Sequence, residues 1–275
     1  MKRFLAILVW GIFGLLVTPE LRAQSASDSV ALVHAPWKTE HLQPGLTFRK
    51  VSIELFGAPQ QMFCLEIDPS LYRLEVVQDQ VRKTPGRQGR RSGARAAING
   101  GFFITRTRQA IANDFLKIDG QVIPSAHGGN RAGIGITDSG CLEFLYLPDS
   151  KNDDTLWHAA YRDVLIAGPM LRLNHRTIPN TNPARHPRSL IGQTSNGNWC
   201  LLVVDGRRRK AAGVTLSELA FIARLLNMES ALNLDGGGSS ALWFKGKGNL
   251  NRPSDRIGFI RFPRPVANCI LVLSR

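Results

Sequence analysis

Short runs in which apolar and polar residues alternate recur along this chain and predict β-strands. The first three cover residues 47–56, 60–67 and 72–78. Alternation with a period of two places one set of side chains on each face of a strand, so these runs predict half-buried strands joined by turns. Further strands are predicted within residues 112–123, 131–147, 164–176, 186–207 and 264–273.

One segment has helical spacing instead. Residues 214–228 place leucine, isoleucine and alanine on one wide face with a period near 3.6. Thr215, followed three residues later by Glu218, has the sequence of a capping box and predicts where the helix begins. Because strands outnumber helices and no tandem repeat occurs, we expect an α+β fold: a single domain on a mixed, largely antiparallel β-sheet with a few packed helices.

The N-terminus has the layout of a signal peptide. Two basic residues precede an apolar run over residues 4–17, and the small residue Ala23 precedes polar sequence. The run is shorter than the roughly 20 residues of a membrane-spanning helix, which disfavours the alternative of a membrane anchor. We expect a periplasmic or secreted mature protein with no stable membrane insertion. Three regions are predicted: a signal peptide over residues 1–23, a polar lead-in over 24–45 and the folded domain over 46–275.

The charge balance favours anionic partners. The chain holds 35 Lys and Arg against 21 Asp and Glu, a formal net charge of +14. Such a surface attracts polyanions, and export disfavours nucleic acid, which leaves anionic lipid surfaces and acidic or phosphorylated glycans. Residues 81–95 combine many basic residues with Pro and Gly and lack acids. They predict a solvated loop or, alternatively, a basic flap near an anionic ligand.

The four cysteines lie far apart in the sequence, which excludes the ligand spacing of a zinc site. They are Cys64, Cys141, Cys200 and Cys269. An oxidising compartment would allow one or two disulfides, and four buried thiols are the alternative. The sequence leaves their pairing and the oligomeric state open.

The strongest candidate for chemistry is the segment ALNLDGGGSSALWF, residues 231–244. It lacks the Lys-Ser/Thr pair of a P-loop and the Gly-x-Ser-x-Gly spacing of a nucleophile elbow. What remains is a carboxylate, Asp235, at a strand end, then glycines that permit close approach of a ligand, then hydroxyls. The alternative is a tight turn in which Asp235 bonds only its own backbone.

Three further constellations carry chemical groups. In AAINGGFF a strand ends at Asn99 before the glycine pair that begins at Gly100. His186 and Arg188 precede another strand, where Arg188 could bind phosphate with two donors and His186 could be an acid, a base or a surface residue. Asp205 precedes Gly206, a pairing more often found in a hairpin turn than at a catalytic acid.

Together these motifs resemble the phosphodiester glycosidase family. The resemblance rests on AAINGGFF, HPRSLIG, LLVVDGR, GVTLSELA and ALNLDGGGSSALW in this order, and it extends over about residues 45 to 273. Ser189 stands where the family usually has threonine, which keeps a hydroxyl. Many bacterial members are exported proteins linked to exopolysaccharide metabolism. The resemblance implies a glycosidase that hydrolyses a sugar C1–O–phosphate bond in a phosphorylated glycan or glycolipid.

The resemblance and the chemistry together suggest roles for individual residues. A carboxylate near C1 stabilises an oxocarbenium-like transition state or acts as nucleophile or base, and Asp235 is the candidate. Arg188 and amides in the glycine segment would bind the phosphate. Asn99 and Ser239 would bond sugar hydroxyls or phosphate. The remaining candidates are Gly100, Gly236, Gly237 and Gly238 for close approach to substrate, and His186, Asp205 and Asp114 for a second acid or base.

Two other functions fit the same residues. One is a non-catalytic envelope protein that binds anionic polysaccharide. The other is a phosphodiesterase that cuts on the phosphate side and releases sugar phosphate. We expect no cofactor, and no spacing demands a metal. A divalent cation held by Asp235, Asp205 and Asp114 remains an option that a chelator titration would test.

Overall fold

The computed structural model describes residues 26–147 and 157–275. The signal peptide predicted over residues 1–23 lies outside the described residues. No helix among the described residues is long and apolar enough to cross a bilayer.

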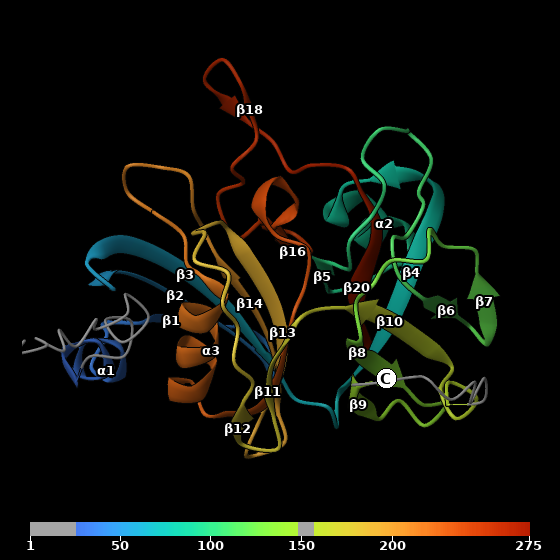
Figure 1. The fold of residues 1–275 in the computed structure, drawn as a ribbon, viewed down its shortest axis with the longest axis horizontal. Helices are drawn as coiled ribbons and strands as arrows, with labels where there is room; N and C mark the ends of the chain where they lie inside the picture. The colour runs from blue at the N-terminus through green and yellow to red at the C-terminus, as the bar shows by residue number, and fades with distance from the viewer. Residues whose placement is uncertain (1–25, 148–156) are drawn as a thin grey trace, which may run out of the picture.

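An eight-stranded antiparallel sheet forms one half of the molecule (Figure 1). Its central strands come from the middle and later parts of the chain, and the N-terminal strands form one edge. The strand order is β1 (Lys38–Gln43), β2 (Leu46–Leu55), β3 (Ala58–Ile67), β14 (Trp199–Val204), β13 (Arg188–Thr194), β15 (Met228–Asn233), β11 (Met170–Leu173) and β12 (Arg176–Thr177).

Two five-stranded antiparallel sheets form the other half of the molecule. One has the order β7 (Gln121–Ile123), β6 (Leu116–Ile118), β10 (Asp163–Ala167), β8 (Ala132–Ile136) and β9 (Leu142–Tyr146). The other has the order β17 (Gly248–Asn249), β16 (Leu242–Phe244), β5 (Ala96–Asn99), β20 (Val266–Ser274) and β4 (Tyr72–Lys83). A separate hairpin consists of β18 (Arg256–Ile257) and β19 (Ile260–Arg261). The α+β class and the antiparallel sheet are confirmed.

The described residues also form three α-helices: α1 (Ala26–Val33), α2 (Pro85–Arg91) and α3 (Leu216–Leu225). The predicted capping box is present at α3, where the Thr215 hydroxyl accepts from the Glu218 amide and the Glu218 carboxylate accepts from the Thr215 amide. The apolar face of α3 packs against β11 and β15, which buries the helix on one face of the large sheet.

The described part of the predicted polar lead-in, residues 26–45, belongs to the fold. It forms α1 and β1, and β1 pairs with β2 from Lys38 opposite Lys50 onwards. The sequence did not predict this strand because β1 is an edge strand whose residues are all exposed or half-buried. Its apolar and polar residues therefore do not alternate.

The basic segment over residues 81–95 is ordered rather than a loop. Its first residues extend β4, and Thr84 then caps α2, with Pro85 in the first turn. Gly86 and Gly89 lie against the ring of Trp243, where a Cβ atom would come within 2.6 Å and 2.7 Å of ring atoms. These glycines therefore permit close helix packing, and Arg90 covers the same ring with its guanidinium carbon 5.7 Å from the centroid.

The four cysteines fall into different environments. Cys64 and Cys200, on the paired strands β3 and β14, are buried with their sulfur atoms 2.7 Å apart. Cys269 is buried and Cys141 is exposed, and all four are free thiols in the structure.

Candidate active site

Three neighbouring central strands of the large sheet bring the residues predicted around Asp235 together, at the end of the sheet where these strands meet. Because the strands are antiparallel, the start of β13 lies beside the ends of β14 and β15: Arg188 pairs with Val204, and Leu190 pairs with Asn233. Asp235 lies two residues beyond the end of β15. The end of β5, from another sheet, meets this end because the carbonyl of Gly100 accepts from the amide of Asp235 at 3.0 Å.

Asn99 is fully buried, and its side chain links these elements through hydrogen bonds. Its side-chain nitrogen donates to the main-chain carbonyl of Asp235 at 2.7 Å. Its side-chain oxygen accepts from the Ser189 hydroxyl at 2.8 Å and from the Ala241 amide at 3.2 Å. An amide side chain offers two donors and two acceptor positions, so the protein itself uses most of them. Asn99 therefore positions the glycine segment rather than contacting a sugar hydroxyl as predicted.

Gly100 also serves the fold. Its amide donates to the carbonyl of Asn268, and a Cβ atom on it would lie 2.2 Å from the Asn268 side-chain oxygen. Only glycine permits this approach. The close neighbour that the motif requires is thus β20, rather than a substrate as predicted.

The amides of the glycine segment are used unequally. The Gly236 amide donates to the Asp235 carboxylate at 2.8 Å, and the Gly237 amide donates to the carbonyl of Pro187 at 2.8 Å. These two are engaged, so they are not the phosphate donors that the sequence suggested. The Gly238 amide is the one of the three without an acceptor among the described residues, and it stays a candidate donor.

The Asp235 carboxylate bonds its own turn, which was one of the two alternatives raised by the sequence. Its Oδ1 atom accepts from its own turn, through the Gly236 amide. Burial raises the pKa of the carboxyl to about 6, although the nearby Ser239 hydroxyl, the Gly236 amide and the Arg264 charge oppose that shift. A carboxyl group with a pKa near 6 exchanges protons readily near neutral pH, which is typical of catalytic acids and bases. The Ser239 hydroxyl is fully buried and has no hydrogen-bond partner among the described residues, and it lies near enough to lower the pKa of Asp235.

Two arginines and a histidine lie beside the glycine segment that follows Asp235, and we call Arg188, Arg207 and His186 the cationic cluster after the two arginines. Arg188 is 8% exposed and donates to the carbonyls of Val214 and Ala184. Its side chain passes under Gly236, where a Cβ atom would lie 3.7 Å from its Cδ. Burial and the neighbouring Arg207 charge lower the pKa of Arg188. No carboxylate among the described residues forms an ion pair with Arg188 or Arg207, so the cluster suits an anion.

Arg207 was missed by the sequence analysis. It is exposed, adopts a positive φ of 57°, and bonds His186 Nδ1 through Nη2 at 3.1 Å. Its guanidinium lies against Gly237, where a Cβ atom would come within 3.0 Å of Nη2. Because a guanidinium can only donate, Nδ1 of His186 accepts and the ring proton resides on Nε2. Burial and the Arg188 and Arg207 charges lower the pKa of His186, which favours this neutral form.

Asp205 has a structural role rather than that of a free acid or base. Its carboxylate pairs with Arg208 at 2.6 Å and accepts from the Asn251 side chain and the Arg252 amide. Burial raises its pKa to about 6, against the opposing effects of these partners. Asn251 in turn donates to the carbonyl of Ser240, so the Asp205 network supports the glycine segment from behind.

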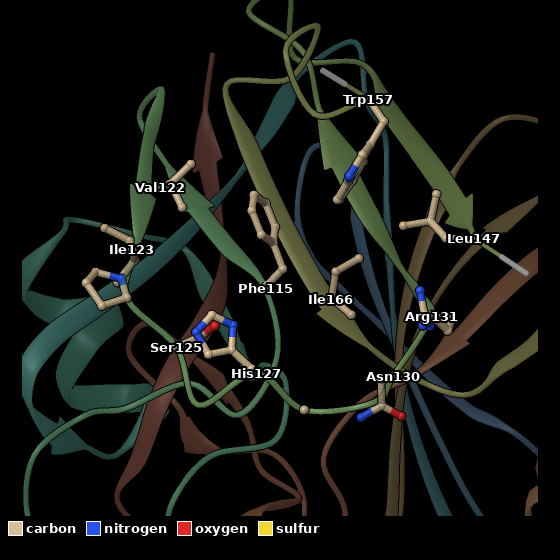
Figure 2. Close-up of a pocket in the computed structure, with 12 residues that line it drawn as sticks. Phe115, Val122, Ile123, Ser125, His127, Asn130, Arg131, Leu147, Trp157 and Ile166 are labelled. Atoms are coloured by element: carbon tan, nitrogen blue, oxygen red, sulfur yellow. The ribbon is translucent and has the colours of Figure 1, made fainter. Parts of the chain in front are cut away.

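Asp114 lies in a different part of the molecule from Asp235. Its carboxylate accepts from the amide and the side chain of Asn130, at 3.0 Å and 2.8 Å. Asn130 lines a largely apolar pocket of about 670 Å³, into which Phe115, Trp157 and Ile166 point (Figure 2). Asp114 thus braces a wall of that pocket and contacts none of the residues around Asp235. No group of three or more His, Cys, Asp or Glu among the described residues could hold a metal ion.

Comparisons with known proteins agree with the motifs. Residues 92–273 match the family described as phosphodiester glycosidase, and this span includes Asp235, Asn99 and the cationic cluster. The curated N-acetylglucosamine-1-phosphodiester alpha-N-acetylglucosaminidase of Bos taurus is 28% identical over 211 residues, which cover 70% of this chain and 39% of that protein. The Mus musculus protein of the same name is 27% identical over 66% of this chain. This chain therefore spans about two fifths of the length of these relatives.

Solved structures share the fold. The catalytic domain of the zebrafish N-acetylglucosamine-1-phosphodiester alpha-N-acetylglucosaminidase, auto-inhibited by its pro-peptide, superposes with a TM-score of 0.68 at 22% identity, over 87% of this chain and 88% of that one. A hypothetical protein from Synechocystis gives the same TM-score at 18% identity, over 87% of this chain and 64% of that one.

Proposed function

Because this chain belongs to the phosphodiester glycosidase family, we propose that it hydrolyses the C1–O bond of a sugar joined through phosphate to a second group. The products are a free sugar and a phosphomonoester. The observation that carries this proposal is the position of Asp235, a carboxyl group with a pKa of about 6, beside a cationic cluster that lacks carboxylate partners among the described residues.

The phosphate of the substrate would bind to the cationic cluster. Arg207 is exposed and its guanidinium lies against Gly237. Arg188 is buried, with its Cδ against Gly236 and with Nε and Nη2 on the carbonyls of Val214 and Ala184, so Nη1 is the nitrogen it would offer. Charge-assisted hydrogen bonds from guanidinium groups are among the strongest that proteins offer to phosphate. The neutral His186 would add an Nε2–H donor.

Asp235 would act in its ionised form at C1. As the C1–O bond breaks, both bonding electrons go to the phosphate oxygen, and positive charge develops on the sugar ring. A carboxylate in a buried setting stabilises that charge strongly because little water screens it. Water adds to C1 and loses a proton to complete the sugar. The leaving phosphate is already weakly basic, so a strong general acid is less needed.

The proposal is tested with a sugar-1-phospho-sugar diester and an assay for free reducing sugar. We expect turnover by the wild type and a loss of about 10²-fold or more in kcat for Asp235→Asn, while Asp138→Asn, at an exposed carboxylate, leaves kcat unchanged. Absence of free sugar across a panel of such diesters, or full activity of Asp235→Asn, would contradict it. Release of sugar phosphate would assign cleavage to the phosphate side. Salt-sensitive binding without turnover would favour the glycan-binding function.

We further propose that the protein works outside the cytoplasm, on a phosphorylated glycan or glycolipid of exopolysaccharide or envelope metabolism. The basic and apolar start of the chain supports export. Mass spectrometry of protein recovered from the producing cells should show a mature N-terminus at Gln24. We also propose that arginine charges, rather than a divalent cation, neutralise the phosphate, so a chelator should leave the rate unchanged.

A further inference from the structure

The hairpin of β18 and β19 carries an exposed apolar tip. Ile257, Phe259 and Ile260 are 74%, 105% and 74% exposed, and Gly258 turns the chain between them with a φ of 58°. The hairpin projects from the body of the protein at the upper edge of Figure 1. Single exposed apolar residues are ordinary, whereas three on one projecting tip indicate a surface that is covered in function.

Arginines flank this tip along the chain, and we call Arg252, Arg256 and Arg261 the arginine ring. Arg252 and Arg256 are exposed, and Arg261 is half-buried with its Nη1 atom donating to the carbonyls of Pro253 and Ser254. These three form no ion pair within the described residues. Residues 252–264 hold four arginines and one acid, Asp255, which pairs with Arg264 at 2.8 Å.

The hairpin is anchored beside the candidate active site. The Arg264–Asp255 pair at its base lies against Gly238, where a Cβ atom would come within 2.2 Å of both side chains. Gly238 follows Asp235 by three residues, and the Arg264 charge lowers the pKa of Asp235. The base of the hairpin is therefore joined to the segment that follows Asp235, and the tip projects from there.

We propose that the β18–β19 hairpin docks this protein on the surface of an anionic lipid bilayer. The apolar tip would enter the boundary between headgroups and acyl chains, and the arginine ring would meet the anionic headgroups. The net charge of +14 attracts the whole molecule to such a surface. A second copy of this chain or a protein partner suits the hairpin less, because six residues offer far less than the roughly 800 Å² that a partner in a stable protein interface buries.

Together with the proposed function, this docking mode specifies a class of substrate. A bilayer touching the tip would be connected to the segment after Asp235 through the base of the hairpin. The substrate class would then include sugars linked through phosphate to a membrane lipid, with the sugar entering the site and the lipid remaining in the bilayer. The docking itself does not depend on the enzyme being a glycosidase.

The test measures sedimentation of the purified protein with vesicles. One set consists of phosphatidylcholine alone, and the other contains phosphatidylglycerol as well. We expect binding to the anionic vesicles that weakens with added salt and falls about tenfold or more in the triple variant Ile257→Ser/Phe259→Ser/Ile260→Ser. The matched control is Val30→Ser/Val33→Ser, which removes exposed valines from α1, far from the hairpin, and should bind as the wild type does.

A Phe259→Trp variant gives a direct signal of insertion. Its fluorescence should shift to the blue on adding anionic vesicles and stay unchanged with phosphatidylcholine alone. Because the tip is solvent-exposed, the triple variant should keep the wild-type melting temperature and its rate on a water-soluble diester. Equal vesicle binding by wild type and triple variant would overturn the proposal. So would a dimer that dissociates in the triple variant without any lipid binding, which would assign the tip to a second copy.

Discussion

The side-chain amide of Asn99 donates a hydrogen bond of 2.7 Å to the main-chain carbonyl of Asp235. The two residues are 136 positions apart and belong to the two glycine motifs. Through this bond, and through Ser189 and Ala241, one buried side chain holds the carboxylate segment in place. Asn99 is thus a positioning residue, whose effect on the reaction runs through Asp235.

Asn99→Ala should destabilise the fold and slow the reaction. It leaves the Ser189 hydroxyl, the Ala241 amide and the Asp235 carbonyl without this partner, at a cost of about 1–3 kcal/mol for each group that stays unsatisfied. We expect a lower melting temperature, a reduced kcat and a KM changed much less. Ser189→Ala, which removes only one of these bonds, should have a smaller effect on both quantities. Wild-type stability and kcat in Asn99→Ala would rule out the positioning role of Asn99.

The pH profile of the reaction should report Asp235. Because its pKa is raised to about 6 and the ionised form acts at C1, kcat/KM should fall as the pH drops below about 6. The check is kcat/KM measured from pH 4 to 8 in buffers of constant ionic strength. A rate that rises as the pH falls through 6 would mean that the protonated form of Asp235 acts instead.

Asp235→Asn should make the protein more stable at neutral pH. The pKa of Asp235 is about 6 in the folded state against 3.8 in the reference state, so the folded protein binds the proton more tightly. That advantage is fully present below pH 3.8 and is lost as the pH rises through 6, where burying the charge costs at most about 3 kcal/mol. Asparagine does not ionise, so the Asp235→Asn variant does not lose stability as the pH rises through 6. Its melting temperature should exceed that of the wild type at pH 7.5, and the gap should close near pH 4.

Arg207→Ala should weaken binding of the phosphate group. Arg207 is exposed, touches Gly237 and bonds His186, and no described carboxylate pairs with it. We expect KM for the diester, and the inhibition constant of inorganic phosphate, to rise about tenfold, equivalent to one charge-assisted hydrogen bond of about 1.5 kcal/mol. Arg209→Ala, at an exposed arginine two residues further along, is the matched control and should change neither constant.

Cys64 and Cys200 should form a disulfide in protein that matures in an oxidising compartment. Their sulfur atoms lie 2.7 Å apart on paired strands. Oxidation joins the two sulfurs and passes two electrons and two protons to a disulfide donor. Thiol titration in denaturant, with peptide mapping, should find Cys141 and Cys269 free and Cys64 linked to Cys200. Four free thiols in exported protein would contradict this expectation.

Several elements followed from the sequence because their signals are local. The alternation over residues 47–56 and 60–67 predicted β2 and β3 within two residues, and Thr215 with Glu218 marked the start of α3. Helix spacing and caps depend on neighbours within one turn, so a single sequence holds the whole signal. The prediction of a solvated loop over residues 81–95 was wrong, because the glycines of this segment pack against Trp243, a residue roughly 150 positions away.

The candidate site shows the same difference between what local sequence signals predict and what long-range contacts decide. The sequence by itself singled out Asp235 and Asn99, because a polar residue at a strand end beside glycine is a local pattern, and Arg188, because an arginine before a strand is a local candidate for phosphate binding. Only the tertiary structure decided their separate roles. Asp205 pairs with Arg208 and accepts from Asn251. The amides of Gly236 and Gly237 are already bonded, and Arg207 bonds His186. Charge pairing and hydrogen-bond partners depend on which strands become neighbours. Long-range burial and register set that choice, and no short stretch of sequence contains it.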